Sequence, residues 1–113
     1  DLTADHLLLV KENDAWQISA LIDFGDAIVG DPLFELIPVY LDLLDGDKDL
    51  LRIFTTNCGL GETLDETRAV KLLNFCLLHP FDVLGGLFDR TPAGHQLPDL
   101  HSLALWLWKT DTP

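Results

Sequence analysis

Residues 1–26 read DLTADHLLLV KENDAWQISA LIDFGD, and this stretch decides how the rest of the chain is interpreted. Two apolar runs, residues 6–10 and 17–24, flank the turn-forming segment at residues 11–14, and this arrangement predicts a β-hairpin. Acidic residues stand at the ends of the two predicted strands. In an antiparallel hairpin the start of the first strand lies beside the end of the second, so we expect these acidic residues to meet.

The predicted open end of the hairpin gathers four carboxylates and one imidazole, from Asp1, Asp5, His6, Asp23 and Asp26. Crowded carboxylates repel one another unless a cation or a substrate offsets their charge. Mg²⁺ prefers one or two carboxylates together with water and phosphate oxygens. The pattern therefore indicates a Mg²⁺ site, and the alternative is that these Asp residues only form turns and helix caps. For Asp26 the turn is the favoured interpretation.

The remainder of the chain predicts helices. Asp31 is placed to cap a helix that begins at Pro32, and Pro38 is expected to kink that helix or to shift its start. A capping box of Thr63 and Glu66 predicts the start of a later helix. Further helices are expected at residues 48–55, 81–89 and 99–109, with a loop at 91–94. The predicted fold class is α+β and mainly α: a short β-hairpin followed by four to five helices.

Composition limits the classes of partner. The 113 residues are 48% hydrophobic and 23% charged, which suffices for one modest core. Their formal net charge of −12 repels nucleic acids and anionic membrane surfaces, and it either attracts cationic small molecules or only keeps the protein in solution. No apolar stretch is long enough for a membrane-spanning helix. Two cysteines suit reduced thiols, so we expect a cytoplasmic protein without membrane partners.

Two tryptophans and one histidine receive structural interpretations. Trp106 and Trp108 are two residues apart on a helix and face different sides, so one is expected in the core and the other at an interface or pocket. Stacking on a ligand is the alternative for the second ring. His79 ends a predicted helix before Pro80, where a favourable interaction with the helix dipole explains it without a functional role.

Three segments carry a resemblance to a known family. Asp1-Leu2-Thr3-Ala4-Asp5-His6-Leu7-Leu8 resembles the catalytic loop of the aminoglycoside phosphotransferase and choline kinase superfamily. Leu21-Ile22-Asp23-Phe24-Gly25-Asp26 resembles its metal-binding segment, and Gly30-Asp31-Pro32-Leu33-Phe34-Glu35-Leu36 resembles the Gly-Asp-Pro helix start that follows. The resemblance implies that residues 1–113 form the C-terminal lobe of a protein-kinase-like fold. The nucleotide-binding lobe, with the residues that bind the cofactor, is then expected upstream of a chain cut from a longer protein.

The resemblance also implies residue roles. In kinase-like phosphoryl transfer one Asp accepts the proton of the acceptor hydroxyl and a second Asp holds Mg²⁺, and these roles fall on Asp1 and Asp23. The family usually has Asn where this chain has His6. Either His6 binds the metal, or the adjacent Asp5 does, or metal binding is weakened. Asp31 and Glu35 are expected to support the site structurally.

The function implied is Mg²⁺-dependent transfer of the γ-phosphate of ATP or GTP to a hydroxyl of a small molecule, such as an aminoglycoside-like compound, an amino alcohol or a sugar. These 113 residues alone are expected to be inactive, because no glycine-rich phosphate loop or nucleotide-anchoring Lys is visible in them. Two other hypotheses remain. One is a catalytically silent kinase-like module for binding or scaffolding, and the other is an acidic helical interaction domain.

Overall fold

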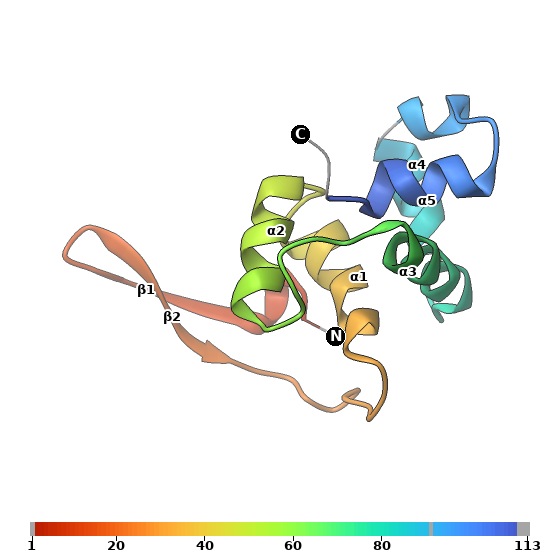
Figure 1. The fold of residues 1–113 in the computed structure, drawn as a ribbon. Helices are drawn as coiled ribbons and strands as arrows, with labels where there is room; N and C mark the ends of the chain where they lie inside the picture. Colours follow the sequence, from red (N-terminus) through yellow and green to blue (C-terminus); the bar gives the residue numbers. More distant parts are fainter. Residues whose placement is uncertain (1, 91, 111–113) are drawn as a thin grey trace.

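The hairpin projects away from a group of helices (Figure 1). The computed structural model describes residues 2–90 and 92–110. Strand β1, Leu7–Glu12, pairs antiparallel with β2, Ala15–Leu21. The two residues between them, Asn13 and Asp14, have φ of 50° and 64°. A two-residue hairpin turn whose twist matches that of the strands requires positive φ at both positions. The predicted hairpin is confirmed, although residues 11 and 12 belong to β1 and not to the turn.

One irregularity interrupts the hairpin near its open end. Leu8 pairs with Ala20 and Leu9 pairs with Ile18, so Ser19 is the extra residue of a bulge. The Ser19 hydroxyl donates a hydrogen bond to the Leu8 carbonyl at 3.0 Å. A bulge strengthens the local twist of the strand that carries it. The last residues of β2 are therefore re-aimed just before the chain leaves the sheet.

The helical part confirms a mainly α fold. The elements within the described residues are η1 (Ala4–His6), η2 (Pro32–Glu35), α1 (Leu36–Pro38), η3 (Val39–Leu43), α2 (Lys48–Asn57), α3 (Glu66–Leu78), α4 (Val83–Arg90), η4 (Pro92–Gln96) and α5 (Leu100–Trp108). Asp31 caps the first of the helices after the hairpin as predicted, because its Oδ1 accepts a hydrogen bond from the Leu33 N–H at 2.9 Å. Pro38 does not shift the start of this helical segment to a later residue. The helical path changes there from α to the wider π form of η3.

Three local predictions are corrected. The N-cap of α3 is Asp65 and not Thr63, because the Asp65 carboxylate accepts the Arg68 N–H at 2.9 Å. Asp and Thr both cap helices well, and the Asp nearer the apolar run prevails. Residues 92–96, predicted as loop in their first part, form the 3₁₀ helix η4. Helix α4 begins at Val83, two residues later than predicted, since the Asp82 carboxylate accepts the Gly85 N–H at 2.8 Å.

The core lies among the helices and not under the hairpin. Helices α3 and α5 pack against each other, and α1 packs on α3 (Figure 1). Trp108 is fully buried with its ring centroid 5.0 Å from that of Tyr40, whereas Trp106 is only partly buried at the core's edge. This confirms that one of the two rings belongs to the core. The buried side chains that pack together in this core are Leu33, Leu36, Ile37, Tyr40, Leu41, Leu51, Leu64, Ala69, Leu72, Leu73, Cys76, Leu87, Leu103, Ala104, Leu107 and Trp108.

The segment before α3 is tied to the end of α5. The Leu64 N–H donates to the Thr110 hydroxyl at 2.8 Å, and the Thr110 N–H donates to the Leu64 carbonyl at 3.1 Å. Within residues 2–90 and 92–110, no single helix is long and apolar enough to cross a membrane, while α3 and α4, bent by 108° to each other, meet that length and composition only as a pair.

Candidate functional site

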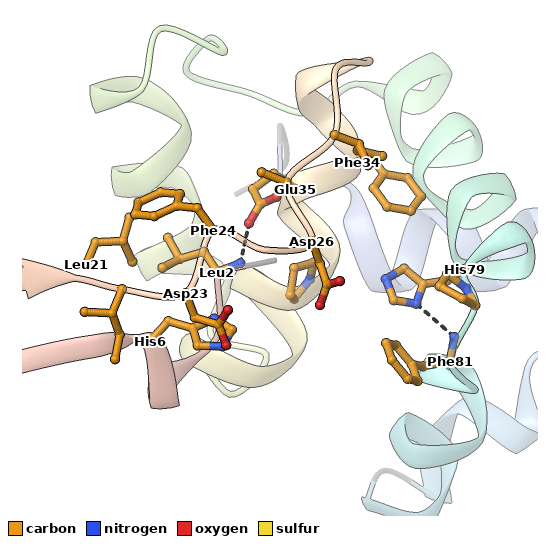
Figure 2. Close-up of a pocket in the computed structure, with 15 residues that line it drawn as sticks. Leu2, His6, Leu21, Asp23, Phe24, Asp26, Phe34, Glu35, His79 and Phe81 are labelled. Atoms are coloured by element: carbon orange, nitrogen blue, oxygen red, sulfur yellow. Dashed lines mark hydrogen bonds and ion pairs between the residues drawn. The ribbon is translucent and has the colours of Figure 1, made fainter.

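A pocket of about 570 Å³ opens beside the free end of the hairpin, between the hairpin and the loop that joins α3 to α4 (Figure 2). Four stretches far apart in the sequence contribute to it. The described residues that line it are Leu2, His6, Leu21, Ile22, Asp23, Phe24, Asp26, Ala27, Ile28, Phe34, Glu35, Pro38, His79, Pro80 and Phe81. All three motif segments of the N-terminal third therefore reach the same space.

Asp23 lies two residues beyond the end of β2 in a left-handed backbone conformation, with φ of 64°. Asp is one of the few side chains that tolerate this region, because a short polar group hydrogen-bonds locally there. Its carboxylate is 65% exposed, and its Oδ2 lies 3.6 Å from Nε2 of His6. The turn of the backbone thus presents the carboxylate at the pocket rim (Figure 2).

His6 is held next to Asp23 by the backbone and by a neighbouring hydroxyl. The Ile22 N–H donates to the His6 carbonyl at 3.0 Å, which continues the hairpin pairing past the last strand residue. On the other side of the ring, Nδ1 lies 3.4 Å from the Thr3 hydroxyl oxygen. His6 is only 16% exposed, so the imidazole is oriented toward Asp23 and not toward bulk water.

Two carboxylates from later helices hold the loop that precedes β1. Glu35, at the end of η2, accepts a hydrogen bond from the Leu2 N–H (Figure 2). Asp42, in η3, accepts one from the Ala4 N–H at 2.9 Å. Hydrogen bonds to ionised acceptors are stronger than those between neutral groups. The helical part of the chain therefore positions the residues that directly follow Asp1.

Asp31 has the structural surroundings of a helix cap. It forms an ion pair with Lys71 of α3 in addition to its bond from Leu33. The hydrogen-bonded Lys71 ammonium and, after it, the Leu33 N–H hold the pKa of the Asp31 carboxyl below its usual range. Asp31 thus joins η2 to α3 behind the pocket lining, of which it is not a part.

One protein family matches the N-terminal part of this chain. Residues 1–70 match the profile of the phosphotransferase enzyme family, APH, which covers more than half of the chain. The chain belongs to this family. The matched phosphotransferase segment includes the hairpin, the turn at Asp23 and the helices that brace the loop before β1. Figure 2 draws His6, Asp23 and Glu35 of that segment on one side of the pocket, whereas Phe34 of the same segment lies beside His79 on the other.

A plant protein is similar to more than half of this chain. "Lysine-specific demethylase JMJ21" of Arabidopsis thaliana is 35% identical over 96 residues. The aligned region comprises 69% of this chain and 10% of that protein, so the chain spans about a tenth of the relative's length. No solved structure matches the chain.

The donor atoms at the pocket suit the Mg²⁺ that phosphotransferases of this family generally use. Asp23 and Asp26 both line the pocket, and Mg²⁺ commonly takes one or two carboxylates and completes its shell with water and phosphate oxygens. Across residues 2–90 and 92–110, no three His, Cys, Asp or Glu side chains are grouped to hold a metal by themselves. An ion here would therefore depend on phosphate and water for most of its ligands.

Three further residues were predicted at the site: Asp1, Asp5 and Asp26. Asp1 lies outside the described residues. Asp5 is exposed in η1 and is not among the described residues that line the pocket. Asp26 occupies the predicted turn, where the Ala27 N–H donates to the Phe24 carbonyl at 3.1 Å, yet its carboxylate also points into the pocket (Figure 2).

Sequence reasoning missed three residues at or behind the site. Asp42 was not singled out because its partner Ala4 is 38 positions away in the sequence. His79 and Phe81 form the pocket wall opposite Asp23, although His79 was explained by its helix end alone (Figure 2). The sequence holds a signal for His79 and Phe81 only. These two residues flank Pro80, and a proline cannot continue α3, so the chain leaves the helix at this point.

Proposed function

We propose that this chain forms the catalytic centre of a phosphotransferase that moves the γ-phosphate of ATP or GTP to a hydroxyl of a small molecule. The observation that carries the proposal is the convergence of three motif segments on one pocket. Glu35 holds the residue after Asp1, and His6 lies beside Asp23. In kinase-like phosphoryl transfer the proton acceptor and the metal ligand act on the same phosphoryl transfer, which agrees with motif segments that share one pocket.

The proposed roles follow from this placement. Asp1 would accept the proton of the acceptor hydroxyl, and its neighbour Leu2 is anchored through its N–H. Asp23 would hold Mg²⁺, with His6 or Asp26 beside it, and when bound the ion would neutralise charge on the phosphate oxygens. Glu35 and Asp31 act as positioning residues, because each contacts the backbone of a motif segment.

The acceptor proposed is a small molecule, and the charge of the chain favours a cationic one. The described residues that line the pocket include three carboxylates and two imidazoles but neither Lys nor Arg. The chain has a formal net charge of −12, so nucleic acids and anionic membranes are poor partners for it. We also propose a cytoplasmic location, in keeping with two thiols of which Cys76 is buried.

A second candidate function is favoured by a specific observation. His6 stands where the family usually has Asn, and its imidazole faces Asp23 at 3.6 Å, where it competes with a metal for that carboxylate. A segment similar to this chain also makes up a tenth of the plant protein named as a lysine-specific demethylase. A catalytically silent module within a larger protein would account for both facts.

The deciding experiment compares Asp23→Asn with Asp14→Asn in the full-length natural protein that carries these residues. Both aspartates are exposed and both have φ of 64°, so the two variants match in charge change and in backbone conformation. Transfer of labelled γ-phosphate from ATP and GTP to a panel of amino alcohols, sugars and aminoglycosides is measured with Mg²⁺.

For a phosphotransferase we expect activity that Asp23→Asn lowers by a factor on the order of 100 or more while Asp14→Asn leaves it unchanged. Nucleotide binding without transfer, equal in all three proteins, would favour the silent module. Equal transfer by all three proteins would contradict the role of Asp23.

A further inference from the structure

The pocket wall opposite Asp23 contains an imidazole whose position is fixed by three contacts. The His79 ring stacks on Phe34, with centroids 5.3 Å apart and an interplanar angle of 14°. Its other neighbour is the ring of Phe81, at 5.8 Å and 41°. The Phe81 N–H donates to His79 Nδ1 at 3.2 Å. A side chain locked in this way by packing and by a hydrogen bond is preorganised for recognition.

The hydrogen bond from Phe81 determines which nitrogen of His79 carries the proton. A ring nitrogen that accepts a hydrogen bond has no hydrogen of its own, so the neutral imidazole carries its hydrogen on Nε2. Figure 2 shows the ring of His79 turned toward the pocket on the side of Asp26. Nε2–H is therefore a donor that the loop between α3 and α4 presents to an occupant.

The surroundings of this donor select the rest of the occupant. Phe81 is 71% exposed and Ile28 is 75% exposed, so both offer apolar surface to the pocket. A flat ring would cover such a surface, since aromatic side chains gain from stacked contacts. Asp26 points into the same space and accepts hydrogen bonds, as a hydroxyl of the occupant would require (Figure 2).

We propose that His79 and Phe81 are the specificity-determining residues for the acceptor, and that the acceptor is a hydroxylated ring compound with a hydrogen-bond acceptor on its ring. The ring lies against Phe81 and accepts from His79 Nε2–H. This proposal rests on the proposed function, since it names the acceptor of the same pocket. Both residues lie beyond the segment that matches the family profile, residues 1–70.

Two probes of nearly equal shape test the donor. Pyridine-3-methanol has a ring nitrogen that accepts a hydrogen bond, whereas benzyl alcohol has a C–H group in its place. Binding of each probe to the full-length natural protein is measured by ligand-observed NMR titration at mildly alkaline pH, where the pyridine nitrogen is unprotonated. We expect pyridine-3-methanol to bind about three- to tenfold more tightly, the worth of one neutral hydrogen bond.

Two variants of His79 separate recognition from structure. His79→Asn keeps an oxygen near the position of Nδ1, which can still accept the Phe81 N–H, but it loses the donor at Nε2. His79→Gln places an amide N–H near the position of Nε2 and loses the acceptor for Phe81. We expect His79→Asn to abolish the preference for pyridine-3-methanol and His79→Gln to retain it. If the role of His79 were purely structural, His79→Gln would impair folding more than His79→Asn, because only Asn keeps an acceptor for the Phe81 N–H.

The outcomes distinguish this proposal from the proposed function. Equal affinity for the two probes, binding of neither, or a preference that persists in His79→Asn would overturn the role of His79. Each of these results is read from binding and is independent of phosphate transfer. Failure of the proposed function is read instead from the labelled-phosphate assay and its Asp23→Asn and Asp14→Asn variants.

Discussion

Replacement of Glu35 is expected to disturb catalysis without touching a reacting atom. Its Oε1 accepts the Leu2 N–H, and Leu2 adjoins the proposed base Asp1. A hydrogen bond to a charged group is worth about 1.5–3 kcal/mol, and one between neutral groups about 0.5–1.5 kcal/mol. Glu35→Ala loses the whole interaction, whereas Glu35→Gln keeps a neutral acceptor. The two variants should therefore differ by the neutral hydrogen bond that Gln retains, about 0.5–1.5 kcal/mol, in how firmly they hold the loop.

These energies translate into rates if the loop must be held for transfer. At about 1.4 kcal/mol per factor of ten, Glu35→Ala should lower kcat by about ten- to a hundredfold, and Glu35→Gln by about three- to tenfold. The acceptor KM should change little, because Glu35 acts through the backbone of the loop. Steady-state kinetics of the full-length natural protein measure both constants.

The control for Glu35 is Glu62→Ala, which removes an exposed carboxylate of the same length from the segment before α3. It should leave kcat within about twofold, as surface substitutions usually do. A Glu35→Ala protein with unchanged kcat would refute the reasoning. So would a Gln variant as impaired as the Ala variant, because the acceptor would then not be what matters.

Two further predictions concern stability. The pKa of Asp31 lies below its ordinary value of 3.8, so the stabilisation it provides is present above that value and is lost as pH falls through the lowered pKa. Asp31→Asn should flatten this part of the profile in urea unfolding between about pH 5 and about pH 2, and an unchanged pH profile would argue against the Lys71 contact. Trp108→Ala removes a fully buried ring that packs on Tyr40 and should cost about 3–5 kcal/mol of unfolding free energy. Trp106→Ala, at a partly buried position, should cost less than half as much, and equal losses measured by helix circular dichroism would contradict the difference in burial.

Features encoded by neighbouring residues could be predicted from the sequence. The hairpin follows from two apolar runs around Asn13-Asp14, and the helix after it follows from Asp31 and Pro32. The approach of His6 to Asp23 also follows, since antiparallel pairing brings the start of one strand to the end of the next. In each case the information lies in local chemistry or in the geometry of a single hairpin.

Contacts between distant segments could not be predicted in the same way. Asp42 reaches Ala4 and His79 stacks on Phe34 only because the packing of α1 and α3 sets where these side chains point. The prediction of the α3 cap was wrong for a different reason. Asp65 and Thr63 are both good caps, and their competition is decided by where the buried face of α3 begins.

The left-handed backbone at Asp23 has an evolutionary consequence. Besides Asp, the residues that accept this conformation most readily are Asn and Gly. Each is reached from an Asp codon by one nucleotide change, and each removes the carboxylate. With the metal-binding role proposed for Asp23, a single mutation would turn a phosphoryl-transferring ancestor into a folded, silent descendant with no penalty to the turn. Loss of chemistry and loss of fold are uncoupled at this position, which leaves natural selection free to keep the shape for another purpose.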